Sequence, residues 1–168
     1  TSDALSSYGD REKKLEILKD PHCGAFAVIR LCTYFLAYFC FAFCIRFSPR
    51  VGLCWTLALV LERGLSGLAV AAFPMAKNTG LAHTFATAAD RESVQKILIV
   101  LSVLLAAALI ALGGGALVAA ALLVLWRYHH VAVKEFGGIT GDLAGWFLQK
   151  AEFWMLAALA ASQWGGIL

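Results

Sequence analysis

The fold is decided by the stretch "ILIVLSVLLAAALIALGGGALVAAALLVLWRY", residues 97–128. It carries no charge before Arg127, and three consecutive glycines at 113–115 divide it into two apolar halves. A helix needs about 20 apolar residues to cross a bilayer. We therefore interpret the stretch as two short membrane spans joined at the glycines, which suit a tight turn or a close helix contact. A phosphate-binding loop would need a Lys-Ser or Lys-Thr pair after the glycines, and none follows.

The composition of the whole chain supports the same class. Of its 168 residues, 61% are hydrophobic and only 15% are charged, whereas soluble domains are about half apolar and about a quarter charged. The net charge is +3 and the basic residues are scattered, which argues against a nucleic-acid partner. None of the five cysteines lies in a CxxC pair, so we expect neither a disulfide framework nor a zinc site. The lipid bilayer is the partner that this composition predicts.

Outward from this stretch, the sequence predicts an all-α, polytopic helix bundle that forms a single membrane domain over residues 1–168. About five transmembrane helices are expected within 24–164, the other three at 24–47, 51–73 and 143–164. The polar segment 1–21 precedes them, and a short helix from Asp10 to Asp20 is expected there, with a capping box at Ser7 and Asp10. Leu15 and Leu18 share one face of that helix, which would suit the membrane surface.

Lysine and arginine residues orient the bundle. Of the 14, ten lie in the N-terminal segment, in the 74–96 loop or between residues 127 and 150, and two, Arg46 and Arg50, lie at the opposite ends of the spans. The positive-inside rule then places the N-terminal segment and the loops 74–96 and 127–142 in the cytoplasm. Three polar segments that meet on one side of a membrane can build one site.

The predicted N-terminal helix carries acids at helical spacing. Glu12, Glu16 and Asp20 follow one another at intervals of four residues, and a divalent cation would relieve their repulsion. Mg²⁺ prefers carboxylate oxygens and keeps several waters, so two or three acids would suffice, and Asp3 could join them. The alternative is that Lys13 and Lys19 neutralise this face.

Charged residues also occur inside the predicted spans, where each costs about 2.5–3.5 kcal/mol on insertion scales. Glu62 and Arg63 point about 100° apart on a helix, so at least one is expected to face a polar cavity, where Arg63 would suit a phosphate. An interhelical ion pair is the alternative. We interpret Arg30 as snorkelling to the interface, and Glu152 is a further acid within a span.

The stretch "FGGITGD", residues 136–142, leads into the last predicted span. Gly137, Gly138 and Gly141 would let a ligand approach the backbone closely. Asp142 at the helix start favours a site where a metal joins the acid to a phosphate, because the acid alone would repel the phosphate. Two alternatives stay open: Asp142 caps the helix, or Gly141 and Gly145 form a G-x-x-x-G packing face.

Three stretches together resemble the cobalamin synthase family, the adenosylcobinamide-GDP ribazoletransferases: "LEILKDPHCGAF" (15–26), "ERGLSGLAVAAFPMAKNTGLAHTF" (62–85) and "FGGITGDLAGWFLQKAE" (136–152). The resemblance covers the C-terminal two thirds of the family pattern. The histidine and first two aspartates of the family's acidic motif have no counterpart, and "TSDAL" matches only its tail at Asp3. Leu18 stands where the family has Met, and Glu62 stands where it has a small residue.

The resemblance implies a membrane transferase that joins adenosylcobinamide-GDP to α-ribazole or its 5′-phosphate and releases GMP, with Mg²⁺ as cofactor. It implies a location in a bacterial-type inner membrane, with small-molecule substrates as partners and either a homo-oligomer or a separate N-terminal half. The catalytic residues would be Asp3, Asp20 and Asp142, which with Glu16 would hold the metal. The residues that would bind substrate or phosphate are Arg63, Lys77, Gly80, Gly137, Gly138, Thr140 and Gly141.

Two other classes of function remain open. A CDP-alcohol type phosphotransferase is one, although its long signature with Asp-Gly-x-x-Ala-Arg is not visible in this chain. A non-catalytic membrane module, such as a transporter subunit, is the other. The charges within the spans would serve a transporter, but that interpretation leaves the "GGITGD" loop without a role.

Overall fold

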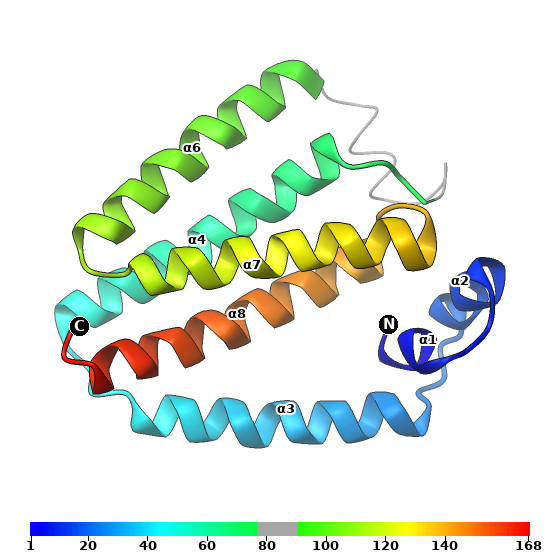
Figure 1. Ribbon diagram of the computed structural model, residues 1–168, viewed down its shortest axis with the longest axis horizontal. Coiled ribbons are helices and arrows are strands. Elements are labelled where there is room, and N and C mark those ends of the chain that lie inside the picture. The colour runs from blue at the N-terminus through cyan, green and yellow to red at the C-terminus, as the bar shows by residue number, and fades with distance from the viewer. Residues whose placement is uncertain (77–90) are drawn as a thin grey trace.

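The computed structural model describes residues 1–76 and 91–168, and it confirms the all-α helix bundle (Figure 1). Five long helices run along the bundle, and three short elements lie at one end of it. The elements in chain order are α1 (Ser2–Ser6), α2 (Arg11–Lys19), α3 (Ala25–Cys44), α4 (Pro49–Ala72), α6 (Arg91–Ala111), α7 (Gly115–Val131), the π-helical turn η1 (Ala132–Phe136) and α8 (Gly141–Trp164). Lys77, Gly80 and most of the 74–96 loop lie outside the described residues.

Four segments of the described chain are long and apolar enough to cross a membrane: α3, α4, α6, and α7 together with η1. The fifth long helix, α8, has 24 residues and a length of about 36 Å, so it could also span the hydrocarbon core. It carries the charged residues Asp142, Lys150 and Glu152. The four segments together with α8 are consistent with the predicted number of about five transmembrane helices, and α8 begins directly after the glycine loop.

The helices around the triple glycine are longer than the two short spans predicted from the sequence. The first begins at Arg91, six residues before the apolar stretch, since a polar helical turn precedes it. The glycines form the predicted hairpin turn: Gly113 has a φ of +87°, a left-handed conformation that favours glycine, and Gly114 precedes α7.

The hydrophobic core lies between α4, α7 and α8, which hold most of the buried side chains. The ring of Tyr128 on α7 stacks on Phe147 of α8 with centroids 5.2 Å apart. In contrast, α3 has no buried residue and exposes a series of large apolar side chains. Both α3 and α6 therefore lie at the periphery of the bundle, where lipid can contact them.

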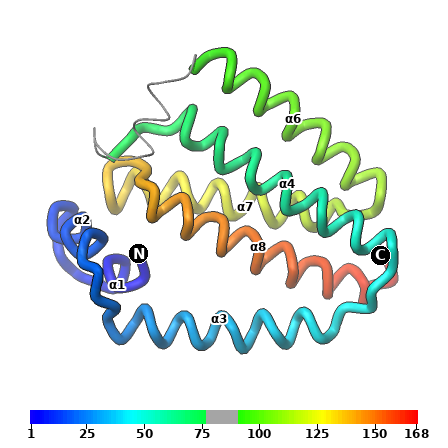
Figure 2. Tube along the Cα trace, turned by 180° about the vertical axis from the view of Figure 1, so that it is seen from behind, coloured from blue at the N-terminus to red at the C-terminus, as the bar shows by residue number. Residues whose placement is uncertain are grey.

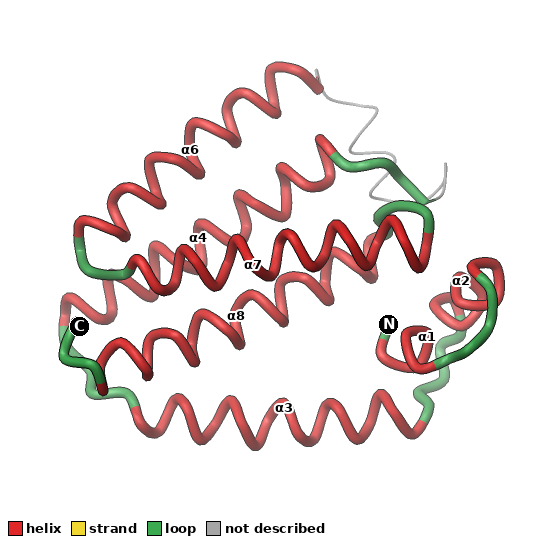
Figure 3. Tube along the Cα trace, viewed as in Figure 1, coloured by secondary structure: helices red, strands yellow, loops and turns green. Residues whose placement is uncertain are grey.

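The described parts of the three polar segments lie at one end of the bundle (Figure 2). The helices α1 and α2, the chain after α4, and the link between η1 and α8 lie there, while the α3–α4 and α6–α7 turns and the C-terminus lie at the other end (Figure 3). The predicted meeting of distant segments on one side is thus seen in the fold, because the long helices bring the chain back to the same end each time.

The N-terminal segment is held by specific contacts rather than by the features predicted from its sequence. Asp10 is itself the N-cap of α2 and accepts a hydrogen bond from the Lys13 backbone N–H at 3.0 Å, so the predicted Ser7–Asp10 capping box is wrong. Leu15 and Leu18 pack against the core cluster of the bundle instead of facing a membrane surface. On the same helix, Lys14 Nζ contacts Glu135 Oε2 of η1 at 2.5 Å.

Asp3 joins α1 to the start of the first long helix. Its Oδ2 accepts a hydrogen bond from the Gly24 N–H and its Oδ1 accepts one from the Ala27 N–H, both at 3.0 Å. These are N–H groups that lack a partner within α3, and the positive end of the helix dipole favours the carboxylate. Asp3 therefore caps α3 from outside the helix.

Replacing this cap should weaken the fold. We expect Asp3→Ala to lower the free energy of unfolding by about 0.5–2 kcal/mol, the usual loss when an N-cap side chain is removed. Thermal unfolding in detergent, followed by circular dichroism, measures it. Glu12→Ala is the matched control, since Glu12 is an exposed acid in the same segment. Equal transition temperatures for the two variants would contradict the capping role.

Candidate functional site

The glycine loop at the start of α8 is fixed against the chain that follows α4. Ile139 donates its N–H to the Pro74 carbonyl oxygen at 2.8 Å, and its own carbonyl accepts from the Ala76 N–H at 3.0 Å. Met75 and Ile139 thereby form an isolated parallel bridge. Two loops distant in sequence are joined by backbone hydrogen bonds, so neither can move without the other.

Two of the predicted site glycines have clear structural reasons. Gly138 has a φ of +155°, and an added Cβ would lie 2.5 Å from the Pro74 carbonyl oxygen. Gly137 has a φ of +78°, and a Cβ there would lie 2.7 Å from the Arg11 guanidinium. Both glycines thus permit close approach, as predicted, but the groups that approach them here belong to the same chain. A substrate-binding role for them stays a prediction.

The structure at the start of α8 tests the two alternatives to a ligand site at Asp142, which were helix capping and G-x-x-x-G packing. Thr140 is the N-cap, with its Oγ1 accepting from the Leu143 N–H at 3.3 Å, so the interpretation of Asp142 as the cap is wrong. A Cβ added at Gly141 or Gly145 would meet nothing within 4 Å, so G-x-x-x-G packing within this chain is also wrong. In the described parts of the chain, no hydrogen bond or ion pair engages the exposed Asp142 carboxylate. It is free to bind a ligand.

The other predicted acids already have partners. Asp3 caps α3, and Glu16 pairs with Lys13 at 2.8 Å, which is the neutralisation that the sequence offered as an alternative. The carboxylate of Asp20 accepts from the His22 backbone N–H and contacts the His22 ring, and the backbone hydrogen bond is the main cause that lowers the pKa of Asp20. Within residues 1–76 and 91–168, no three His, Cys, Asp or Glu side chains are placed to hold a metal. The role of these acids as metal ligands stays a prediction.

Glu62 and Arg63 pair with each other rather than across helices. Arg63 Nε lies 3.6 Å from Glu62 Oε1, and within the described residues neither side chain forms the interhelical ion pair that the sequence offered as an alternative. The Glu62 side chain is fully buried and neither of its oxygens has a hydrogen-bond partner, whereas Arg63 is exposed. Arg63 lies nine residues before the end of α4, about 14 Å along the helix from the loops. A phosphate contact by Arg63 stays a prediction.

Glu152 lies opposite α3 in the middle of the bundle. Tyr38 of α3 donates its hydroxyl hydrogen to Glu152 Oε1 at 2.8 Å. This bond connects α3, which is otherwise loosely packed, to α8.

A cleft of about 400 Å³ opens between the start of α3 and the start of α8. Asp142 lies in it together with two cations, Arg30 and Lys150. The complete lining is Thr1, Ser2, Ala27, Arg30, Leu31, Tyr34, Asp142, Gly145, Trp146, Gln149 and Lys150. Its volume lies within the range of roughly 300–1,000 Å³ that is typical of ligand pockets.

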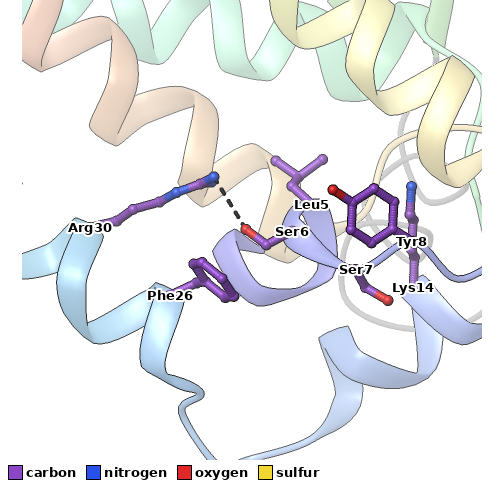
Figure 4. A pocket seen from close by; sticks show the side chains of 7 residues that line it. All are labelled: Leu5, Ser6, Ser7, Tyr8, Lys14, Phe26 and Arg30. Atoms are coloured by element: carbon purple, nitrogen blue, oxygen red, sulfur yellow. Dashed lines mark hydrogen bonds between the residues drawn. The ribbon is translucent and has the colours of Figure 1, made fainter.

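A second hollow adjoins this cleft on the other side of Arg30 (Figure 4). It is enclosed by α1, α2 and the start of α3, and Arg30 donates to Ser6 Oγ there at 3.3 Å. Figure 4 shows the Arg30 side chain extending from α3 toward Ser6 of α1. Arg30 thus lies at the boundary between the two hollows, and its snorkelling to a membrane interface stays a prediction.

Comparison with known proteins identifies the family to which this chain belongs. The family described as cobalamin-5-phosphate synthase matches residues 1–160. The chain belongs to this family. No solved structure matches it.

Curated relatives in this cobalamin-5-phosphate synthase family bear one name, adenosylcobinamide-GDP ribazoletransferase. The protein from Lachnoclostridium phytofermentans is 40% identical over 163 residues, which cover 95% of this chain and 61% of the relative. The one from a Geobacillus species is 32% identical over 160 residues, covering 92% and 61%. That from Pseudomonas syringae pv. tomato is 31% identical over 157 residues, covering 93% and 63%. The chain therefore spans less than two thirds of the length of these relatives.

Sequence reasoning missed Arg30 and Lys150 as members of one cleft. Each looks like an isolated charge near the end of a span. The signal was the spacing: Ala27, Arg30 and Tyr34 recur at three to four residues along α3, as do lining positions of α8 from Asp142 to Lys150. Pairing those two faces would have revealed the cleft.

The backbone contact at Gly138 leads to a test with a matched control. Gly138→Ala should destabilise the protein by about 1–3 kcal/mol, because the new Cβ collides with the backbone of residues 74–76 at a left-handed position. Gly141→Ala should be neutral or slightly stabilising, since the space is open and alanine favours a helix. Thermal unfolding of both variants in detergent measures this. If Gly138→Ala were as stable as Gly141→Ala, the close contact between the loops would be refuted.

Proposed function

We propose that this chain supplies the active site of a membrane transferase that joins adenosylcobinamide-GDP to α-ribazole or its 5′-phosphate and releases GMP. The observation that carries the proposal is the family match over residues 1–160, together with the shared name of the relatives. The gathering of α1, α2, the chain that directly follows α4 and the loop that precedes α8 at one end of the bundle supports it, because a two-substrate reaction needs converging groups (Figure 1).

In the proposed reaction, a ribose hydroxyl attacks the phosphorus next to the corrinoid's aminopropanol linker, and GMP leaves. Enzymes of phosphoryl transfer act mainly by positioning and by neutralising charge. Asp142 is the acid best placed to take part, since it lines the cleft between α3 and α8 with a free carboxylate. The bridge between Pro74–Ala76 and Ile139 would fix the loop that presents it.

Mg²⁺ remains part of the proposal, because a metal bound beside Asp142 would offset negative charge on the phosphoryl oxygens. The described residues do not gather the four predicted acids around one point, and Asp3 is engaged in capping α3. Of the four acids, Asp142 is the one that would hold the metal.

We further propose that the end of the bundle with α1, α2 and the glycine loop faces the cytoplasm of a bacterial-type inner membrane. The excess of lysine and arginine in the segments at this end supports that orientation. The substrates would then reach the cleft from the cytoplasmic side.

The reaction can be tested directly. Membranes that contain the protein should release GMP from adenosylcobinamide-GDP when α-ribazole and Mg²⁺ are present, as measured by chromatography. Asp142→Asn should slow the release by about a hundredfold, a typical loss when a group that acts on the transition state is removed. Glu12→Gln, a change of the same kind at an exposed acid outside the cleft, should leave the rate unchanged. Full activity of Asp142→Asn would refute the role of Asp142, and absence of GMP would refute the reaction.

The orientation can be tested with the protein's own cysteines. Cys23 precedes α3 at the proposed cytoplasmic end, and Cys44 is the last residue of the same helix. In variants that keep only one cysteine, a membrane-impermeant maleimide should label Cys44 on intact spheroplasts and Cys23 only after permeabilisation. The reverse pattern would contradict the orientation.

A further inference from the structure

The cleft between α3 and α8 is formed by one face of each helix. On α8 the lining begins with Asp142 and continues through Trp146 and Gln149 to Lys150, about two turns further along the helix. On α3 it is formed mainly by Arg30 and Tyr34. The acid therefore lies at one end of the α8 face and the cation lies deeper, with aromatic and amide side chains between them.

Among the described residues, the cations of this region form no ion pair, not even with Asp142 in the same cleft. Lys150 is only partly exposed, and the charges that act on it most strongly are those of Arg30 and of Arg127 on α7, both positive. Across the described segments 1–76 and 91–168, no acidic side chain forms an ion pair with any of the three. The one hydrogen bond that Arg30 makes through its side chain there goes to a neutral hydroxyl, that of Ser6.

Two cations and one acid line the cleft, so its lining is net positive, and an anion is attracted toward Arg30 and Lys150, away from Asp142. Arginine and lysine are the side chains that most often bind phosphate, with arginine offering paired donors. The rings of Trp146 and Tyr34 in the same cleft present flat apolar surface on which an aromatic base can stack. The combination fits a ligand with a phosphate at one end and a base at the other.

We propose that the α3–α8 cleft binds the phosphate of a nucleotide-type substrate, with Arg30 and Lys150 as its donors and Trp146 and Tyr34 as the wall for its base. This assignment rests on the proposed function for the identity of the substrate, since both substrates of that reaction can carry a ribose phosphate joined to a base. Arg30 and Lys150 belong to none of the substrate-binding residues that the family motifs imply.

The test uses GDP as the probe and measures binding without turnover. The protein is placed in nanodiscs of zwitterionic lipid, and titration calorimetry gives the Kd for GDP, inorganic phosphate and guanosine. We expect GDP to bind more tightly than guanosine. Arg30→Gln and Lys150→Gln should each weaken GDP binding by about tenfold or more, as expected when a hydrogen bond to a charged group is lost, and should leave guanosine binding unchanged.

Two controls make the result specific. Lys96→Gln removes a cation from the same end of the bundle, where Lys96 pairs with Glu92 on α6, and should leave GDP binding unchanged. Arg30→Lys should keep part of the affinity, because the charge remains while the paired donors are lost. If Arg30→Gln does not fold, Lys150→Gln carries the test alone.

Several outcomes would overturn the assignment. These are unchanged GDP affinity in Lys150→Gln, an equal loss in Lys96→Gln, or guanosine binding as tightly as GDP. GDP binding that disappears in nanodiscs with anionic lipid would show that the cleft receives a lipid headgroup instead. Failure of the proposed function is distinguishable, since a protein could bind GDP through Arg30 and Lys150 without releasing GMP, or release GMP with both variants at the normal rate.

Discussion

A chain inside a bilayer must satisfy its backbone hydrogen bonds within its own helices, and the rest of this structure depends on that constraint. The apolar stretches therefore form long helices, and the irregular, glycine-containing backbone lies at the helix ends. Because each helix pair returns the chain to the same side, α2 contacts η1, and the segment Pro74–Ala76 pairs with Ile139 at the same end of the bundle. The polar end is then held by a few contacts: Asp3 with α3, Lys14 with Glu135, and the bridge at Ile139.

The cleft between α3 and α8 shows how this arrangement can serve a reaction. The helix α3 has no buried residue and is joined to α8 near its middle by the bond between Tyr38 and Glu152. Between that bond and the starts of α3 and α8, the two helices form the cleft, which leaves room for a ligand. The cleft combines an acid, Asp142, with two cations, Arg30 and Lys150, and none of the three forms an ion pair within the described part of the chain. Neutralising a phosphate and activating or positioning a second group are the two tasks that the proposed transfer requires.

Hydrophobic length and the triple glycine were enough to predict the helices, their number and the end at which the polar segments meet. The details of the candidate site were less accessible, because the sequence does not show which backbone N–H groups need a partner. The cap that Asp3 forms with two N–H groups of α3 was not foreseen, and Thr140 rather than Asp142 caps α8. Arg30 and Lys150 were missed for a different reason: their proximity depends on how two helices pair, which no single helix pattern contains.

The contact of Lys14 with Glu135 offers the most direct measurement of whether the N-terminal helices dock on the loop end as described. A carbodiimide joins an amine to a carboxylate only when the two touch, and mass spectrometry identifies the linked peptides. The structure predicts a Lys14–Glu135 cross-link in the membrane-embedded protein, together with the exposed pairs Lys13–Glu16 and Lys96–Glu92 as internal controls. Formation of the two control links without the Lys14–Glu135 link would contradict the assembled site.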